Sequence, residues 1–281
     1  MGQADRPVSD DGAPAPSSDD RHQIRVFSFG GGVQSTAALV LAAQGRIDYQ
    51  TFLFADTGDE HPDTYDYLTS VHLPFAEKHG IEIRVLKKTW RDGSQYSILE
   101  QIDRLKSALP IPAYLDSGKP LRRHCTSDWK VLVLDKYMKE HGATPTAPMA
   151  CGMGISLDEV HRARDSRVPF KVLEYPLLDL RLRRSDCVKI TSDAGLPPAP
   201  RSACYYCPFH STEHWRDLRE DHPVLFARAV ELETELSTRA ERYFGSGVRL
   251  WRRGKLANLD DQQRLVFDDG PEDCDSGHCF T

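Results

Sequence analysis

The chain has 281 residues, which is enough for one large domain or for a core with a smaller appendage. Its 40% hydrophobic and 28% charged residues are typical of a soluble globular protein, and no apolar run is long enough to span a bilayer. A net charge of −6 argues against general attraction to nucleic acid, and the lack of a secretory pattern after Met1 predicts a cytoplasmic location.

Residues 1–22 are rich in Asp, Pro, Ser, Gly and Ala, which predicts a disordered tail. From residue 23 onward, apolar runs of strand length alternate with helical segments, the order typical of a parallel sheet. The predicted strands are 24–29, 49–55, 81–86, 148–155 and 171–175. The predicted helices are 34–44, 62–79, 97–106, 127–141 and a short one that follows Ser156. The sequence therefore predicts an α/β fold with a doubly wound, mostly parallel five-stranded sheet, in a domain over residues 23–180.

Two helix starts, Ser97 with Glu100 and Ser156 with Glu159, have the spacing of a capping box. Residues 107–119 between them are punctuated by proline and glycine, which predicts a mobile loop.

After Asp179 the chain becomes cysteine-rich and mainly helical, over residues 181–259. The predicted helices of this region are 185–194, 211–219 and 223–244. Residues 260–281 are acidic, and we expect a flexible tail that carries a pair of cysteines.

Three consecutive glycines, Gly30 to Gly32, separate the first predicted strand from the first predicted helix. Glycines permit positive φ angles and let backbone N–H groups approach a ligand without a Cβ in the way. The helix start adds unsatisfied N–H groups and the positive end of its dipole at the same place. A phosphate is the natural ligand of such a loop, although an ordinary tight turn also uses one or two glycines. No Gly-Lys-[Ser/Thr] follows, so the loop is not of the Walker type.

The stretch from Gly30 to Ser35 resembles the pyrophosphate-binding loop, Ser-Gly-Gly-x-Asp-Ser, of the PP-loop ATP pyrophosphatases and adenine-nucleotide alpha hydrolases. Gly31, Gly32 and Ser35 match this pattern, whereas Gly30 replaces its first serine and Gln34 its aspartate. The resemblance implies a HUP/PP-loop fold that binds ATP and Mg²⁺ through the loop and its neighbours. The expected contacts come from the loop residues, Ser28 and Thr36.

Asp56-Thr57-Gly58 ends the second predicted strand, and Pro62-Asp63-Thr64 follows it. This stretch resembles the Asp-Thr-Gly-x-x-x-Pro-[Glu/Asp]-Thr segment of the phosphoadenylylsulfate (PAPS) reductase branch of the same superfamily. The resemblance places Asp56, Thr57 and Gly58 beside the nucleotide or its metal. The alternative is that Asp56 only caps the next helix.

The stretch from Gly152 to Arg162 resembles the Gly-x-[Arg/Ser]-x-x-Glu-x-x-Arg element of that branch. The resemblance places Gly154 and Glu159 at the nucleotide, although Glu159 could instead complete the capping box. Arg162 lies one turn further on the same helix face, and its fork of donors suits a phosphate or sulfate. Lys130 and Arg123 are expected to stabilise developing phosphate charge.

Local basic clusters could line a channel for an anionic substrate or could be ordinary solvated faces. They are 122–124, 162–167, 181–184 and 249–255.

Four cysteines are candidate ligands of one metal centre. Cys204 and Cys207 stand one turn apart, Cys187 precedes them, and Cys125 follows a basic cluster. The block around them resembles the cysteine-rich part of PAPS-reductase-like proteins, whose relatives often hold an iron–sulfur cluster. We therefore expect a [4Fe–4S] cluster, with structural Zn²⁺ as the alternative, and Cys151 as a small core residue.

Cys274 and Cys279 lie in the predicted acidic tail. PAPS reductases carry a cysteine on a mobile tail that enters the site, so the resemblance implies a catalytic role for one of these thiols. The alternative is a tail with incidental cysteines.

Together these features predict an ATP-dependent, adenylating and pyrophosphate-releasing sulfur-transfer enzyme. One alternative is reduction of PAPS or adenylylsulfate by a tail cysteine, and another is a nucleotide-binding protein with a structural zinc site. Expected partners are a nucleotide, an anionic or nucleic-acid acceptor, and a sulfur donor such as a cysteine desulfurase or a thioredoxin-like reductant. The sequence predicts no membrane association and leaves the acceptor and the oligomeric state open.

Overall fold

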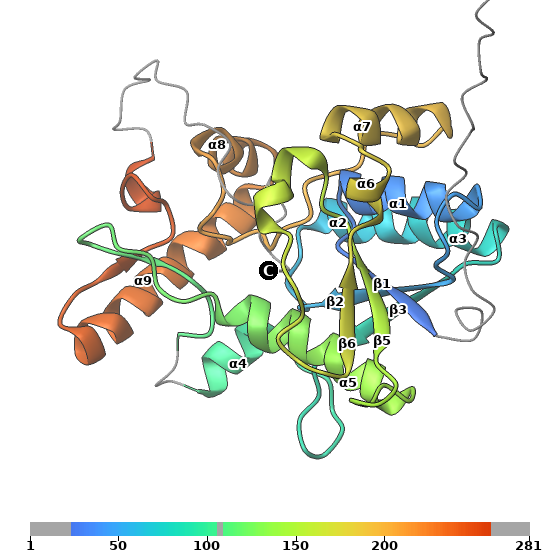
Figure 1. Ribbon diagram of the computed structural model, residues 1–281. Coiled ribbons are helices and arrows are strands. Elements are labelled where there is room, and N and C mark those ends of the chain that lie inside the picture. Colours follow the sequence, from blue (N-terminus) through green and yellow to red (C-terminus); the bar gives the residue numbers. More distant parts are fainter. Residues whose placement is uncertain (1–23, 106–108, 260–281) are drawn as a thin grey trace, which may run out of the picture.

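The protein is described by a computed structural model that covers residues 24–105 and 109–259. Five parallel strands form its central sheet in the order β3-β2-β1-β5-β6 (Figure 1). They are β1 (Arg25–Phe29), β2 (Thr51–Asp56), β3 (Glu82–Lys87), β5 (Met149–Met153) and β6 (Lys171–Glu174). Since β1 pairs with β2 on one side and β5 on the other, the strand order reverses beside it. Open parallel sheets bind ligands at the carboxyl ends of the strands at such a reversal.

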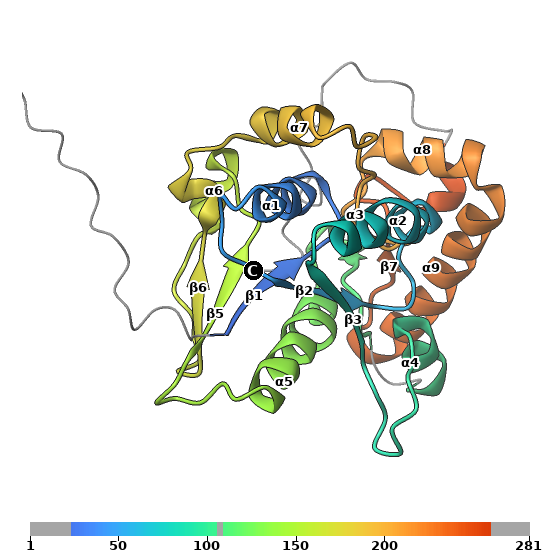
Figure 2. The ribbon, with the colours of Figure 1, turned by 90° about the vertical axis from the view of Figure 1, so that its right-hand side faces the viewer.

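Helices cover both faces of the sheet, which confirms the predicted doubly wound fold (Figure 2). Phe27 and Phe29 of β1 pack in the core beneath α1, α3 and α7, whereas Val26 packs on the other face beneath α5. This alternation follows from the period of two along a strand. The helices are α1 (Val33–Ala43), α2 (Pro62–Tyr67), α3 (Leu73–Lys78), α4 (Ile98–Arg104), α5 (Leu132–Glu140), α6 (Pro176–Asp179), α7 (Arg184–Asp193), α8 (Thr212–Asp221) and α9 (Pro223–Phe244).

A further hydrophobic core belongs to the C-terminal helices. Helices α4, α8 and α9 surround it together with a small antiparallel pair, β4 (Tyr114–Leu115) and β7 (Val248–Arg249). Three of the four tryptophans of the chain are buried in this core, and Trp90 packs against it. The C-terminal part is therefore mainly helical, as the sequence predicts.

Some local predictions differ from the structure. The predicted helix 62–79 contains a π-helical turn at Leu68–His72, and the helix predicted over 127–141 begins with another at Cys125–Val131. Residues 107–119 include β4 rather than only a loop. The Ser97–Glu100 capping box forms, with both hydrogen bonds present. The predicted box at Ser156 does not form, because a 3₁₀ turn at Leu157–Arg162 directs Glu159 elsewhere.

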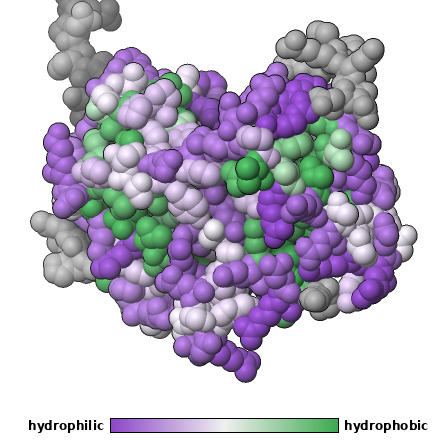
Figure 3. All heavy atoms as spheres, turned by 180° about the vertical axis from the view of Figure 1, so that it is seen from behind, coloured by the Kyte–Doolittle hydropathy of each residue, from purple (hydrophilic) through white to green (hydrophobic). Residues whose placement is uncertain are grey.

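Seen from behind, the surface carries hydrophobic side chains in separate patches among hydrophilic ones (Figure 3). No helix among the described residues is both long and apolar enough to cross a membrane.

Candidate functional site

The glycine loop lies at the carboxyl edge of β1. Gly31 has a φ of +76°, and a Cβ at this position would lie 3.4 Å from the Phe54 ring. Helix α1 begins directly after Gly32, which provides no side-chain cap. The first N–H groups of this helix therefore stand at the edge of the sheet without a capping side chain, the arrangement that binds anions.

Two hydroxyl groups close the loop from inside. Ser35 and Thr36 both donate to the Gly32 carbonyl, each at 2.9 Å. The Thr36 hydroxyl also lies 2.9 Å from Nε2 of the buried His72, so it faces the core rather than a ligand. Ser202 donates to the Gly30 carbonyl, and it belongs to the segment that carries Cys204.

A buried polar network supports the loop from the side of β5. Gln34 Nε2 donates to Glu159 at 3.4 Å, and Arg162 lies 3.0 Å from the same carboxylate. Burial raises the pKa of Glu159 to about 7, against the effect of Arg162. A Cβ on Gly154 would lie 3.4 Å from the Ser35 nitrogen, so this glycine permits the close approach. Glu159 thus puts a carboxyl group beside Gln34, which replaces an aspartate of the PP-loop pattern.

Asp56 lies at the end of β2 with both carboxylate oxygens engaged. One oxygen is 3.1 Å from Lys87 Nζ, and the other accepts hydrogen bonds from the Tyr65 hydroxyl and the Gly58 N–H. Gly58 has a φ of +82° and packs against Ser97. The alternative that Asp56 caps the next helix is wrong, because His61 is the N-cap of α2. Asp56 instead orders the turn at Gly58 and holds the Tyr65 hydroxyl.

A buried cluster between the sheet and the C-terminal part joins Thr57, Glu60, Lys130 and Cys204. Glu60 Oε1 accepts from the Thr57 hydroxyl at 3.2 Å and lies 3.5 Å from Lys130 Nζ. The Cys204 sulfur lies 3.3 Å from the same hydroxyl. Burial and the nearby Glu60 carboxylate raise the pKa of the Cys204 thiol well above its usual range. Glu60 Oε2 is buried and has no hydrogen-bond partner among the described residues.

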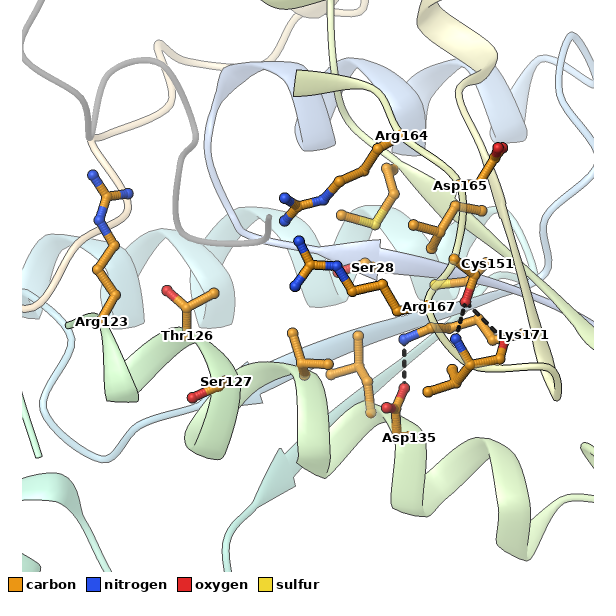
Figure 4. Close-up of a pocket in the computed structure, with 16 residues that line it drawn as sticks. Ser28, Arg123, Thr126, Ser127, Asp135, Cys151, Arg164, Asp165, Arg167 and Lys171 are labelled. Atoms are coloured by element: carbon orange, nitrogen blue, oxygen red, sulfur yellow. Dashed lines mark hydrogen bonds and ion pairs between the residues drawn. The ribbon is translucent and has the colours of Figure 1, made fainter. Parts of the chain in front are cut away.

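A cavity of about 360 Å³ opens on the α5 side of the sheet edge. The guanidinium groups of Arg164 and Arg167 extend over Ser28, and Arg123 lies across the cavity from them (Figure 4). The Ser28 hydroxyl is buried and has no partner within the described part of the chain. Lys171, which also lines the cavity, is paired with Asp135 at 2.6 Å. The cavity therefore combines cationic groups with an orphaned hydroxyl at the strand reversal.

Comparison with known proteins finds a family model that is similar to the segment carrying the glycine loop. Residues 24–110 match the family model of the phosphoadenosine phosphosulfate reductase domain. This stretch includes both the glycine loop and the Asp56 turn. The similarity to this domain is confined to these residues of the chain.

Two solved structures are similar to this chain. One is the PAPS reductase of Candida auris in complex with phosphate, with 13% identity, a TM-score of 0.42, and coverage of 65% of this chain and 78% of that one. The other is the U34-tRNA thiolase NcsA of Methanococcus maripaludis with its [4Fe-4S] cluster, with 14% identity, a TM-score of 0.41, and coverage of 75% and 71%. No curated protein matches the chain.

The four candidate cysteines of this chain do not gather as one quartet. Cys125 is close enough to raise the pKa of Cys204, and Cys207 follows one turn later with its N–H bonded to the Cys204 carbonyl at 3.0 Å. Cys187 instead lies in the core where α7 packs on α1, because a thiol is small and apolar enough to fill that position. Burial raises the pKa of Cys187 to about 12. Cys274 and Cys279 lie outside the described residues.

Two parts of the site were missed from the sequence. Glu60 stands in the Asp-Thr-Gly stretch, and the spacing from Asp56 gave no sign that it would meet Lys130 and Cys204. Arg164 and Arg167 belong to a basic cluster that is visible in the sequence. Only the fold shows that their side chains line a cavity rather than an ordinary solvated face.

Proposed function

We propose that the chain binds ATP across the carboxyl edge of the sheet and cleaves it between the α- and β-phosphates, adenylating an acceptor. The observation that carries the proposal is the uncapped start of α1 behind the glycine loop, on the same edge as the arginine-lined cavity. The left-handed Gly31 and the orphaned Ser28 hydroxyl fit an anionic nucleotide at this place. The match to the PAPS reductase domain supports the same location.

In this proposal the backbone N–H groups of Gly31 and Gly32 hold the β- and γ-phosphates, because a helix start favours negative charge. Arg164 and Arg167 hold an anionic group of the nucleotide or of the acceptor, since guanidinium groups bind oxyanions through paired donors. Lys130, buried beside Glu60, stabilises the charge that develops on the phosphate. In this proposal the N–H groups and the arginines hold negative charge that the ligands already carry, and Lys130 faces the negative charge that develops during cleavage.

We also propose that Cys125, Cys204 and Cys207 form the sulfur-handling centre. The four-cysteine ligand set expected for a [4Fe–4S] cluster does not fit, because Cys187 is buried in another core. At most three of the four candidate thiols can therefore serve one centre in this conformation. The orphaned Glu60 oxygen beside Cys204 supports a polar or cationic group there.

Reductive cleavage of PAPS is the second candidate function. The cluster of arginines around the cavity favours it, because PAPS carries a 3′-phosphate and a sulfate that both need cationic partners. In that case a tail cysteine, Cys274 or Cys279, would be the nucleophile.

Nucleotide titration of the full chain distinguishes ATP cleavage from reductive cleavage of PAPS. The proposal predicts that ATP binds and releases pyrophosphate, and that the double variant Arg164→Gln/Arg167→Gln weakens binding by at least about tenfold, as expected when a charge-assisted contact of 1.5–3 kcal/mol is lost. Arg46→Gln is the matched control, because this exposed arginine lines another pocket, formed with Asp48 and Pro176. Binding of adenosine 3′,5′-bisphosphate without binding of ATP would select the PAPS reaction. Binding of neither nucleotide would overturn both.

A further inference from the structure

A second group of ligand-type side chains lies away from the cysteines and the arginine-lined cavity. His61 and Asp63 come from the loop and first turn after β2, and His222 joins α8 to α9. The ligand atoms of these three residues all lie within 4.8 Å of one another. The group thus brings together the PP-loop domain and the C-terminal helices.

From this arrangement we propose that His61, Asp63 and His222 form a binding site for Zn²⁺. Asp63 lies 3.5 Å from His61 Nδ1 and, through its other oxygen, 3.7 Å from His222 Nε2. Tetrahedral ligands at about 2.0–2.2 Å from Zn²⁺ are themselves roughly 3.3–3.6 Å apart. The two separations are close to these values but involve different Asp63 oxygens, so a small rotation of this exposed carboxylate would present one oxygen to an ion held by both histidines.

The backbone holds the two histidines in place. The His61 N–H donates to the Ala203 carbonyl at 2.9 Å, and the His222 N–H donates to the Leu218 carbonyl at 2.9 Å. Their rings meet edge to face with centroids 4.7 Å apart. His61 Nδ1 accepts only a long bond of 3.3 Å from the Asp63 N–H, which a metal ion would replace. Two imidazoles and one carboxylate are a usual protein ligand set for Zn²⁺.

The surroundings leave room for a further ligand. The three residues line a cavity of about 330 Å³ that also includes Glu213, His214 and Asp217. Nε2 of His214 is buried and has no hydrogen-bond partner among the described residues, and its ring lies 6.1 Å from that of His61. An unsatisfied ring nitrogen in the wall of the same cavity indicates a water or ion beside it. Three protein ligands with one open position would let water or an anion complete the tetrahedron.

Metal titration of the full chain tests this site. After removal of metal with EDTA, Co²⁺ is used as the optical probe and Zn²⁺ as the stabilising ion. The wild type should bind Co²⁺ at a site without the sulfur-to-cobalt charge-transfer band, and Zn²⁺ should raise its unfolding midpoint. Asp63→Asn and His222→Gln should each weaken Co²⁺ binding at this site by at least about tenfold. Even the loss of a residue that only supports a metal ligand lowers metal affinity by about tenfold or more.

His79→Gln is the matched control, because His79 is exposed at the end of α3. It should bind both ions as the wild type does. The Asp63 side chain is 56% exposed, so Asp63→Asn tests the site even where His222→Gln fails to fold. Co²⁺ affinity that is unchanged in Asp63→Asn, or cobalt bound by thiolates alone, would overturn the proposal.

Discussion

At the scale of single residues, two glycines of the loop allow the effect of backbone strain to be distinguished from the effect of lost ligand contact. Gly31 has a positive φ, whereas Gly32 has a φ of −90° and a Cβ there would meet only Ser202, at 3.9 Å. Replacing Gly31 with alanine should destabilise the protein by about 1–2 kcal/mol, the cost of a left-handed conformation. If the loop holds phosphate, both Gly31→Ala and Gly32→Ala should weaken ATP binding, because each Cβ stands among the N–H groups.

Gly45→Ala is the matched control, because Gly45 has a φ of +69° and a Cβ added there would have no neighbour within 4 Å. It should lower the urea midpoint as Gly31→Ala does and leave ATP binding unchanged. ATP affinity at the wild-type level in Gly32→Ala would argue against phosphate binding by the loop.

The second prediction at this scale concerns acid stability and His72. This ring is buried, and burial lowers its pKa from 6.5 to about 3. Between these values the unfolded chain binds more protons than the folded protein, so the stability falls as pH falls below 6.5. From pH 7 to pH 5 the loss should be about 2 kcal/mol, at 1.36 kcal/mol per pH unit below 6.5. Urea unfolding of His72→Gln, which can still bond the Thr36 hydroxyl, should show a correspondingly smaller loss. An equal loss in wild type and variant would contradict this assignment, and His79→Gln should behave as the wild type.

At the scale of elements, a buried carboxylate of α9 bonds to two backbone N–H groups in the last part of the described chain. Glu233 accepts hydrogen bonds from the Leu250 N–H at 2.7 Å and from the Leu256 N–H at 2.9 Å. Glu233→Ala leaves two buried N–H groups without partners and should cost about 2–6 kcal/mol, at 1–3 kcal/mol for each group. Glu231→Ala, on the exposed side of the same helix, should cost less than about 1 kcal/mol. Denaturant unfolding measures both, and equal losses would show that the two N–H groups find other partners.

The elements also show what could be predicted from the sequence. The five strands of the sheet were predicted because each is a short segment rich in apolar residues and bounded by turns. The strands β4 and β7 were not, since two residues carry no periodicity and their pairing joins Tyr114 to Arg249 across the chain. Glu233 would be assigned to a solvated helix face by its charge alone. Motif residues such as Gly31 and Asp56 were found because their neighbours in sequence are also their neighbours in space.

At the scale of the whole molecule, contacts between residues that are far apart in the sequence could not be predicted from motifs and spacing. The sequence grouped Cys187 with Cys204, but the packing of α7 on α1 separates them. Conversely, nothing in the spacing of His61 and His222 indicated that the junction of α8 and α9 would bring their rings together. Both outcomes depend on how the C-terminal helices pack beside the sheet.

This packing predicts that the sheet and the C-terminal helices unfold as one unit. The segment before Cys204 connects them, because Ser202 bonds to the Gly30 carbonyl and the His61 N–H bonds to the Ala203 carbonyl. All four tryptophans report on the C-terminal core, whereas circular dichroism reports on helices of both parts. ATP at 100 times its dissociation constant stabilises the folded state by about 2.7 kcal/mol, so it should move both unfolding transitions by the same amount. A shift in circular dichroism without a shift in tryptophan fluorescence would show instead that the two cores unfold independently, and that the contacts of Ser202 and His61 are too weak to couple them.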